Sequence, residues 1–372
     1  MSIKKLLTID IDSKRIFGLD ILRCFAILFV VFGHANLLLP ASVAAVLDHF
    51  VLDGVSIFFV LSGFLIGGIL IKLLEKNELT FKLVLDFWQR RWFRTLPNYF
   101  LILSVLCLLS LLFEPGFNIL STPRYFVFSQ NLYRPHPLFF PEAWSLSIEE
   151  WFYLLLPTTI LFAVFVLRFK LRKALPLTIF SIIIAVTAFR FFRYSHMQEV
   201  NLEIWDIYFR KQVLTRLDSL MYGVLGAYLT YYKNDLWLRH KVLLFATGLL
   251  LLVLPGFIAE RQYGSIYWSV FSFSVNALAT LSLLPYLGTV KTGSGRLYKA
   301  VTYISLVSYS MYLINFSIVM GWIINRLPLQ GYGGLTQSVV SYGLFWILTI
   351  VFSILLYKYF ELPTTKWRDK IK

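Results

Sequence analysis

The chain is poor in charged residues, in cysteine and in long hydrophilic stretches. Only 15% of its 372 residues are charged and 58% are hydrophobic, which excludes a soluble globular domain of this length. The two cysteines, Cys24 and Cys107, both lie in apolar runs, so we expect buried thiols rather than a disulfide. No hydrophilic stretch is long enough to form a separate domain. We therefore expect an all-α, polytopic integral membrane protein that spans the lipid bilayer.

Apolar runs long enough to cross a bilayer recur along the whole sequence. A helix needs about 20 apolar residues to span the hydrocarbon core, and we expect about ten transmembrane helices. In the second of them, Gly63 and Gly67 have the GxxxG spacing that favours close packing between helices. The ten segments lie near residues 17–39, 51–73, 96–113, 146–167, 174–192, 213–232, 241–258, 267–288, 303–324 and 337–359.

The net charge of +15 reflects membrane topology rather than nucleic acid binding. With the N-terminus in the cytoplasm, most Lys and Arg residues fall in loops on the cytoplasmic side. The positive-inside rule therefore predicts that both termini are cytoplasmic. We expect a cytoplasmic tail at residues 1–16, the transmembrane domain at 17–363 and a second cytoplasmic tail at 364–372.

The first predicted helix carries ionisable side chains inside an apolar run. Asp20, Arg23 and His34 are functional candidates, because a charged side chain within a spanning helix is costly. Arg23 and His34 are separated by about three helical turns, so they share one face and lie roughly 16 Å apart along the axis. Asp20 precedes Arg23 by three residues, and we expect it to neutralise the guanidinium group.

Further polar and ionisable groups are expected at the depth of His34, at the outer ends of other helices. A histidine acts as a general base when a carboxylate or carbonyl group orients it. Ser147 and Glu150 have the spacing of a helix capping box, so Glu150 has a structural explanation and we prefer Glu149 as the functional acid. The candidates in this group, besides His34, are Asp53, Glu149, Glu150, Arg216, Asp218 and Asn315.

An arginine cluster, RRWFRTLP, precedes the third predicted helix on the inner side. Arg90 and Arg94 share a helical face, and Arg91 lies beside them. The cluster either anchors the helix at the membrane surface together with Trp88 and Trp92, or binds phosphate, since guanidinium groups pair with phosphate oxygens. The sequence has no P-loop and no dinucleotide-binding fingerprint, so the cluster alone names no nucleotide.

Two other kinds of active site find little support in the sequence. No G-x-S-x-G motif occurs, and Ser62 is better explained as a packing residue. The five histidines are scattered without the paired spacing of metal ligands, so we expect no metal site.

Seven sequence blocks, taken in order, resemble the acyltransferase-3 family of multi-span membrane proteins. Members of this family mostly O-acetylate surface polysaccharides and related glycans. The first block is the Arg23–His34 spacing, and the match extends from about Gly18 to Pro363. The other blocks are DGVSIFFVLSGFLI (Asp53–Ile66), RRWFRTLPNY (Arg90–Tyr99), WSLSIEEWFYLLLP (Trp144–Pro157), RLDSLMYG (Arg216–Gly223), SYSMYLI (Ser308–Ile314) and YFELP (Tyr359–Pro363).

The resemblance implies an acyl-CoA donor, usually acetyl-CoA, that binds from the cytosol. It also implies a glycan hydroxyl group as the acceptor at the outer face. By the same resemblance, Arg23 and His34 form the catalytic pair and Glu149 has a functional position. The donor-binding region contains Arg90, Arg91 and Arg94.

Two positions depart from the pattern of the family. Asn315 stands where many members have a histidine after the Tyr-Leu pair, and Trp151 stands where a glutamine often follows the paired acids. Both departures bear on acceptor choice or local hydrogen bonding, and they leave Arg23 and His34 unchanged. The soluble esterase-like domain that is fused to some members is absent from this sequence, which favours the stand-alone form.

We therefore expect an O-acyltransferase of the bacterial inner membrane that transfers an acyl group, preferably acetyl. The expected acceptor is an envelope glycan such as O-antigen, lipopolysaccharide or capsule, or a lipid-linked oligosaccharide. A transporter or flippase would use the polar face of the first helix, from Arg23 to His34, as a substrate path, and a sensor or scaffold without turnover is a third alternative. Consumption of acyl-CoA distinguishes the enzyme from the transporter.

Overall fold

The structure, a computed structural model, describes residues 15–78, 80–258, 262–328 and 334–367. Within these ranges every regular element is helical, which confirms the predicted all-α class. Most of the two expected cytoplasmic tails, 1–16 and 364–372, lies outside the described residues. Cys24 and Cys107 are buried free thiols, as predicted.

The α-helices differ widely in length, and short 3-10 or π-helical segments continue or connect them. The α-helices are α2 (Phe17–Ala35), α3 (Ala41–Asp48), α4 (Gly54–Lys76), α5 (Phe81–Phe113), α6 (Pro123–Phe126), α7 (Ala143–Phe165), α8 (Leu171–Ser195), α9 (Leu202–Trp205), α10 (Leu217–Tyr232), α11 (Asn234–Arg239), α12 (Lys241–Ile258), α13 (Ser272–Leu287), α14 (Gly295–Ile314), α15 (Gly334–Leu356) and α16 (Leu362–Trp367). The other segments are η1 (Asn36–Leu38), η2 (Ile119–Ser121), η3 (Asp206–Arg210), η4 (Val213–Thr215), η5 (Tyr267–Phe271), η6 (Asn315–Ile323), η7 (Ile324–Arg326) and η8 (Tyr357–Glu361).

Each of the ten predicted spans overlaps a helix of the structure. In the described part of the chain, 8 helical segments are long and apolar enough to cross a membrane. The two other predicted spans correspond to α10 and α12, which are shorter by this measure. The cytoplasmic location of the termini stays a prediction.

Helix α5 begins much earlier than the expected start at residue 96. The side chain of Thr80 accepts a hydrogen bond from the backbone N–H of Leu83 at 3.2 Å and caps the first turn. Pro97 lies inside the helix. The prediction was wrong because the charged residues before Pro97 end the apolar run without ending the helix. The arginine cluster is therefore part of α5 and does not precede it.

Helices α4 and α10 pack so closely that their glycines have no room for a side chain. A Cβ atom at Gly63 would lie 1.9 Å from the carbonyl oxygen of Leu220, and one at Gly223 would lie 2.1 Å from that of Val60. This contact confirms the close packing that the GxxxG spacing predicted for α4. It fixes the helix that forms one wall of the site described below.

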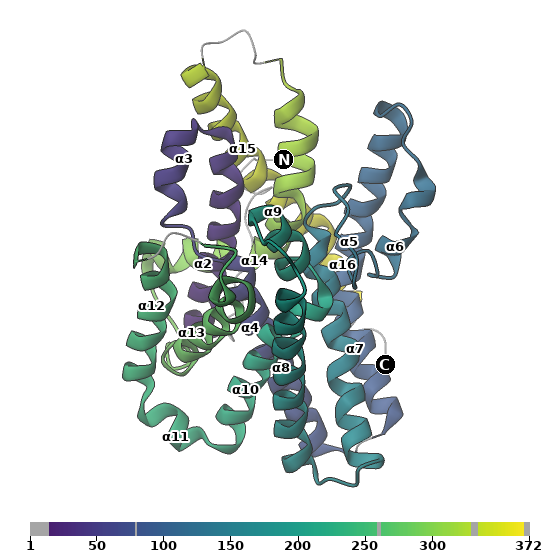
Figure 1. Ribbon diagram of the computed structural model, residues 1–372, viewed down its shortest axis with the longest axis vertical. Coiled ribbons are helices and arrows are strands. Elements are labelled where there is room, and N and C mark those ends of the chain that lie inside the picture. The colour runs from purple at the N-terminus through teal and green to yellow at the C-terminus, as the bar shows by residue number, and fades with distance from the viewer. Residues whose placement is uncertain (1–14, 79, 259–261, 329–333, 368–372) are drawn as a thin grey trace.

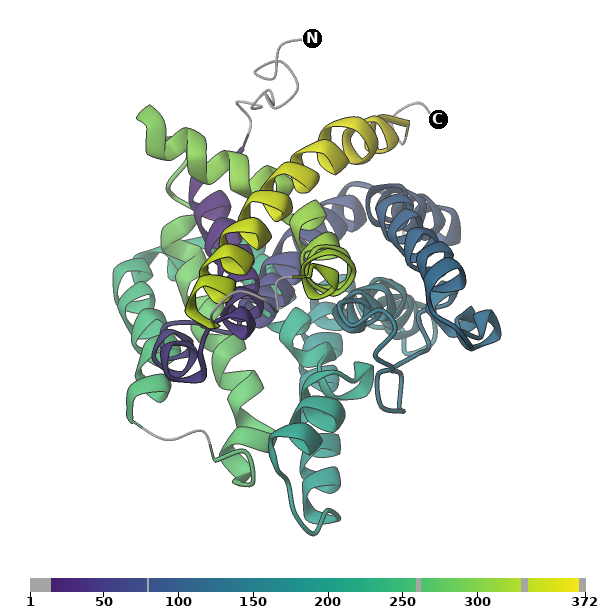
Figure 2. The same cartoon turned by 90° about the horizontal axis from the view of Figure 1, so that it is seen from above.

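Connections between helices lie at both ends of the bundle. In Figure 1, α3 lies toward the upper end of the molecule, whereas α11 and the turn between α7 and α8 lie at the lower end. Seen from above in Figure 2, the lime-green segment that contains η6 lies near the middle of the bundle. Helices α2 and α7 lie on either side of it, which brings residues far apart in sequence around one centre.

Candidate active site

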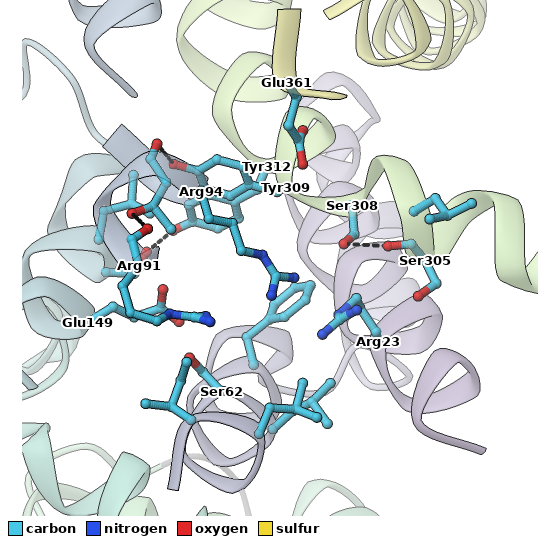
Figure 3. A pocket seen from close by; sticks show the side chains of 18 of the residues that line it. Arg23, Ser62, Arg91, Arg94, Glu149, Ser305, Ser308, Tyr309, Tyr312 and Glu361 are labelled. Carbon is cyan, nitrogen blue, oxygen red and sulfur yellow. Dashed lines mark hydrogen bonds between the residues drawn. The ribbon is translucent and has the colours of Figure 1, made fainter. Parts of the chain in front are cut away.

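A cavity of about 290 Å³ lies among helices α2, α4, α5, α7 and α14 and the C-terminal segment η8–α16. Apart from Ser62, the wall on α4 is apolar, and most of the polar groups come from the other helices. Figure 3 shows side chains from several helices that point into the cavity. The polar and aromatic residues on the wall are Arg15, Arg23, Phe58, Phe59, Ser62, Arg91, Arg94, Thr95, Ser145, Glu149, Tyr153, Ser305, Ser308, Tyr309, Tyr312, Tyr357, Glu361 and Thr365.

Three arginines meet at this cavity from two helices. Arg23 comes from α2, and Arg91 and Arg94 come from one turn of α5 (Figure 3). Arg91 is buried with its guanidinium carbon 5.5 Å from the centre of the Tyr153 ring, whereas Arg94 is exposed. Among the described residues, no carboxylate lies within ion-pair distance of any of the three. Guanidinium groups in this situation favour an anionic ligand.

Arg90 does not belong to this group. It is exposed and does not line the cavity, although the sequence placed it with Arg94 on one helical face. The inward face of α5 is defined by Arg91 and Arg94, and Arg90 is rotated away from Arg91 by about 100°. Of the three arginines in the predicted cluster, Arg91 and Arg94 therefore line the cavity and Arg90 does not.

Asp20 pairs with a different arginine from the one expected. Its carboxylate forms an ion pair with Arg15, which also bonds it through Nε at 2.9 Å, and it accepts a hydrogen bond from Ser305 at 2.7 Å. Asp20 therefore links α14 to the start of α2 and leaves the Arg23 guanidinium without an ion pair. The prediction of an Asp20–Arg23 pair was wrong, because spacing along one helix does not reveal a partner from the preceding segment.

The predicted capping box at Ser147 and Glu150 does not form. Helix α7 begins at Ala143, one turn earlier, and the Ser147 hydroxyl donates to the Ala143 carbonyl at 3.1 Å. Glu150 instead accepts a hydrogen bond from Thr95 of α5 at 2.9 Å. Glu149 lines the cavity and accepts from the Tyr153 hydroxyl at 3.2 Å.

His34 has one firmly assigned partner, Asn315. The distance between His34 Nδ1 and Asn315 Oδ1 is 2.5 Å. Asn315 Nδ2 donates to the backbone carbonyls of Met311 at 2.8 Å and Tyr312 at 2.9 Å, so the amide oxygen must be the atom that faces the ring. Nδ1 therefore carries the proton, and Nε2 of the neutral ring has the free lone pair. An amide takes the place of the carboxylate that we expected beside His34.

The position of Asn315 depends on a change of helix type. The chain passes from α14 into the π-helical segment η6 at Asn315, and such a change removes regular backbone partners. Buried Glu142 supplies a replacement: its carboxylate accepts from the backbone N–H of Ser317 at 2.6 Å and from the Ser317 hydroxyl. Burial raises the pKa of Glu142, and the two hydrogen bonds lower it. Burial is the larger effect, so the pKa is about 7.

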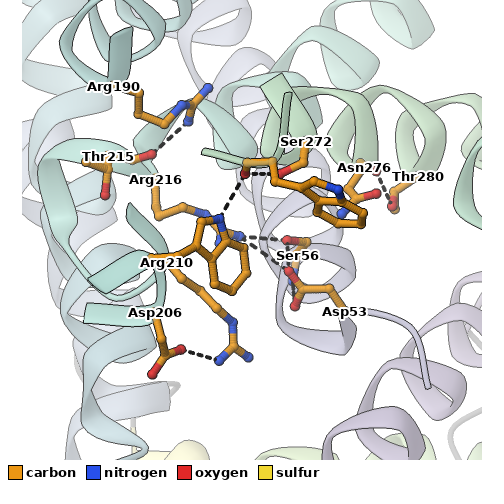
Figure 4. Close-up of polar contacts among 12 residues, drawn as sticks. Asp53, Ser56, Arg190, Asp206, Arg210, Thr215, Arg216, Ser272, Asn276 and Thr280 are labelled. Atoms are coloured by element: carbon orange, nitrogen blue, oxygen red, sulfur yellow. Dashed lines mark hydrogen bonds and ion pairs between the residues drawn. The ribbon is translucent and has the colours of Figure 1, made fainter. Parts of the chain in front are cut away.

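The remaining predicted residues form a polar network beside the cavity (Figure 4). Asp53 accepts from Ser56, whose hydroxyl in turn accepts from Arg216 at 2.6 Å. Burial raises the pKa of Asp53, but the charges of Arg216 and Arg210 outweigh this effect and hold it below its ordinary value.

Asp218 is fully buried and forms an ion pair with Arg190 at 2.7 Å. Neither Asp218 nor Arg216 lines the cavity, although the Arg216 guanidinium lies 5.4 Å from the ring centre of Phe59, which does. Of the group predicted at the depth of His34, only Asn315 is in hydrogen-bond contact with it. These ion pairs tie α8, α10 and α4 together.

Sequence reasoning missed several residues on the cavity wall. Glu361 accepts from Ser310 at 2.6 Å and from Asn98 at 3.0 Å, and it lines the cavity with Tyr309 and Tyr312. Glu361 belongs to the terminal YFELP block, where an acid directly after an apolar span was a signal that we did not use. The two tyrosines carried no comparable signal, because aromatic residues are common throughout this chain.

Comparisons with known proteins agree with this arrangement of blocks. Residues 16–358 match a family model described as an acyltransferase domain. O-acetyltransferase OatA of Staphylococcus aureus, strains NCTC 8325 / PS 47 and COL, is 28% identical over 374 residues, which cover 94% of this chain and 57% of each relative. The chain thus spans little more than half the length of these relatives, and no solved structure matches it significantly. Because the family model covers nearly the whole sequence, the chain belongs to the acyltransferase-3 family.

Proposed function

We propose that this protein is an integral membrane O-acyltransferase. It moves an acyl group, preferably acetyl, from cytosolic acyl-CoA to a hydroxyl group of an extracytoplasmic glycan, such as O-antigen, capsule or another envelope polysaccharide. Membership of the acyltransferase-3 family and the O-acetyltransferase names of the relatives support this proposal. The bacterial inner membrane is the proposed location, since the acyl-CoA pool is cytosolic and the acceptor lies outside.

The donor is proposed to bind at the arginine-lined cavity. The phosphates of CoA are multiply charged, and Arg91 and Arg94 offer guanidinium groups that have no carboxylate within ion-pair distance in the described part of the chain. The volume of about 290 Å³ suits the narrow pantetheine arm, so the head group stays at the mouth near exposed Arg94. Arg90, outside the cavity, contributes only to that mouth.

His34 is proposed to be the general base. Nε2 accepts the proton of the acceptor hydroxyl as the hydroxyl oxygen forms a bond to the thioester carbonyl carbon. The tetrahedral intermediate then breaks its C–S bond, and the imidazolium returns the proton to the leaving thiolate. The products are an O-acyl ester and CoA with a free thiol. Arg23 is proposed to stabilise negative charge on the donor or in the transition state. Glu149, which accepts a hydrogen bond from Tyr153, is proposed to orient His34 or the acceptor.

The observation that carries the proposal is the coexistence of two features on α2. Arg23 lines a cavity rich in unpaired cations, and His34 on the same helix has its tautomer fixed by Asn315. A transporter or flippase also needs buried charges, but it gains nothing from a histidine locked with a free Nε2. A sensor or scaffold needs neither feature.

Purified protein incubated with isotope-labelled acetyl-CoA and oligosaccharides released from host envelope glycans tests the proposal. Wild type should release CoA and label the glycan, and His34→Ala should reduce both rates by 10²-fold or more. His240→Ala, which changes an exposed histidine, should behave as wild type. Arg91→Ala should raise the KM for acetyl-CoA about tenfold, whereas exposed Arg239→Ala should not.

Two results would contradict the proposal. Intact thioester after incubation of folded wild type with several acyl-CoA donors and host glycans would favour transport. Equal turnover by wild type and His34→Ala would remove His34 from the chemistry.

A further inference from the structure

A second and larger cavity of about 730 Å³ lies at the other end of α5 from the arginines. Arg94 and Glu114 border the two cavities, and they are about 30 Å apart at the rise of an α-helix. By the predicted topology this second cavity faces outward. We call it the outer cavity. Its lining residues are Leu37, Leu38, Ser110, Glu114, Phe117, Ser121, Leu138, Phe139, Pro141, Phe316, Ser317, Met320, Gly321, Trp322, Asn325 and Arg326.

The outer cavity adjoins His34 directly. Phe316 forms part of its wall, and the centre of the Phe316 ring is 4.5 Å from that of the His34 ring. Leu37 and Leu38, one helical turn beyond His34, form another part. A molecule that fills the outer cavity therefore comes within one side chain of the proposed base.

The wall of the outer cavity combines aromatic rings with polar groups. Phe117 and Phe139 stack at 5.2 Å between ring centres. Arg326 forms an ion pair with Glu114 at 3.0 Å and lies 3.6 Å from the centre of the Trp322 ring. A sugar ring presents C–H faces that pack on aromatic rings and hydroxyl groups that bond to carboxylate and guanidinium groups. A lipid chain would use only the apolar part of this wall.

We infer that the outer cavity binds the acceptor glycan of the acyl transfer. This inference rests on the proposed function, and it adds where the acceptor lies and which face of His34 it approaches. One or two sugar units occupy the cavity, with a hydroxyl group beside His34 and the rest of the glycan outside. Glu142 holds Ser317, and hence this wall, in place.

Gly321 gives a sharp test, because it lines the cavity and faces open space. A Cβ atom there meets a single atom within 4 Å, the carbonyl oxygen of Phe316 at 3.5 Å. Gly321→Trp should therefore fill the cavity, whereas Gly321→Ala should leave it open. Gly343→Trp is the matched control, since Gly343 is exposed on α15 with nothing within 4 Å of such a Cβ.

The primary measurement is equilibrium binding of oligosaccharides, released from host envelope glycans, to each purified variant. Gly321→Trp should weaken this binding at least tenfold and keep the wild-type affinity for CoA. Gly343→Trp should bind both ligands as wild type does, and Gly321→Ala should weaken oligosaccharide binding less than Gly321→Trp. Because binding is measured without turnover, a failure of acyl transfer leaves this test intact.

The inference would be overturned if Gly321→Trp bound oligosaccharide with wild-type affinity. It would also be overturned if the tryptophan side chain displaced a bound lipid from the cavity in preference to oligosaccharide. Where Gly321→Trp loses CoA affinity as well, Asn325→Ala decides. Asn325 is exposed on the cavity wall, so its loss should weaken oligosaccharide binding several-fold with CoA affinity unchanged. Unchanged oligosaccharide binding in Asn325→Ala would then reject the outer cavity as the acceptor site.

Discussion

At the scale of single residues, the proposed chemistry depends on the contact between His34 and Asn315. An amide oxygen can only accept, so it fixes the proton on Nδ1 as a carboxylate would, but it brings no negative charge into the apolar bundle. The amide is itself held by two backbone carbonyls of α14. The departure from the family pattern at position 315 thus keeps a group that orients the base.

Asn315→Ala should lower kcat for acyl transfer by about tenfold to a hundredfold, because His34 loses the bond that selects its tautomer. The KM for acyl-CoA should stay the same, since Asn315 is not on the wall of the arginine-lined cavity. Steady-state kinetics with both substrates varied measures this split. Asn77→Ala is the control: Asn77 also donates to a helix carbonyl, that of Leu73 at 2.9 Å, but it is exposed at the end of α4.

Sequence reasoning found several ionisable residues of the site but not their partners. Arg23 and Glu149 stood out because each interrupts an apolar run, and Arg91 because it belongs to an arginine cluster; all three line one cavity. The partner of Asp20 and the orientation of Arg90 were wrong, because both depend on which face of a helix meets its neighbours. That information comes from packing between segments far apart in the sequence.

At the scale of elements, the junction of α14 and η6 sets the geometry around His34. Glu142 precedes α7 and binds Ser317 of η6 through its side chain, while its backbone carbonyl accepts from Tyr312 of α14 at 3.1 Å. One residue thus clamps the junction from both sides of Asn315. Tyr312 also bonds to Ser145 at 2.6 Å on the wall of the arginine-lined cavity, so the clamp adjoins both cavities.

This clamp makes stability depend on pH in a defined direction. The pKa of Glu142 is about 7 in the folded protein, above its ordinary value of 4.5, so the folded protein holds this proton more tightly than the unfolded chain does. The stability gained from protonation is complete below about pH 4.5 and is lost as the pH rises to about 7, a change of about 3 kcal/mol. Tyr125, a neighbour whose pKa burial raises, does not ionise in this range.

Thermal unfolding of detergent-solubilised protein checks this prediction. Relative to Glu142→Gln, which keeps the side-chain shape but does not titrate, the wild-type Tm should fall by several degrees between pH 4.5 and 7 and then level off. Glu75→Gln, which changes a carboxylate near the C-terminal end of α4, serves as the control. If the Tm of wild type and that of Glu142→Gln changed with pH in parallel, burial would not raise the pKa of Glu142 in the way described.

The elements themselves were largely predictable, apart from where some of them begin. Hydropathy located the spans because backbone groups in lipid must be bonded within helices. It missed the start of α5 at Phe81, whose first turns are polar, and the start of α7 at Ala143, where a capping-box spacing suggested a later one. The π-helical segment η6 had no sequence signal, because it depends on Glu142 from another part of the chain.

At the scale of the whole molecule, two cavities follow one another along the helical bundle. Glu142, which contacts Tyr312 on one wall and Ser317 on the other, lies between them. The arginine-lined cavity suits an anionic donor, and the outer cavity suits an uncharged, hydroxyl-rich acceptor. Along the chain, His34 lies between Arg23, which lines the first cavity, and Leu37, which lines the second. The central claim is that the acyl group crosses the membrane plane while CoA stays on its own side.

Transfer in proteoliposomes with both substrates on defined sides tests this claim most directly. Labelled acetyl-CoA is added outside vesicles that contain oligosaccharide inside. The fraction of protein with its arginine-lined cavity outward is scored by labelling Leu297→Cys, an exposed position in the first turn of α14 on the predicted inner side. The account predicts labelled oligosaccharide inside and all CoA outside, with no label for His34→Ala. The claim would be contradicted if transfer occurred only with both substrates on the same side of the membrane. It would also be contradicted if labelled acetyl-CoA appeared inside the vesicles.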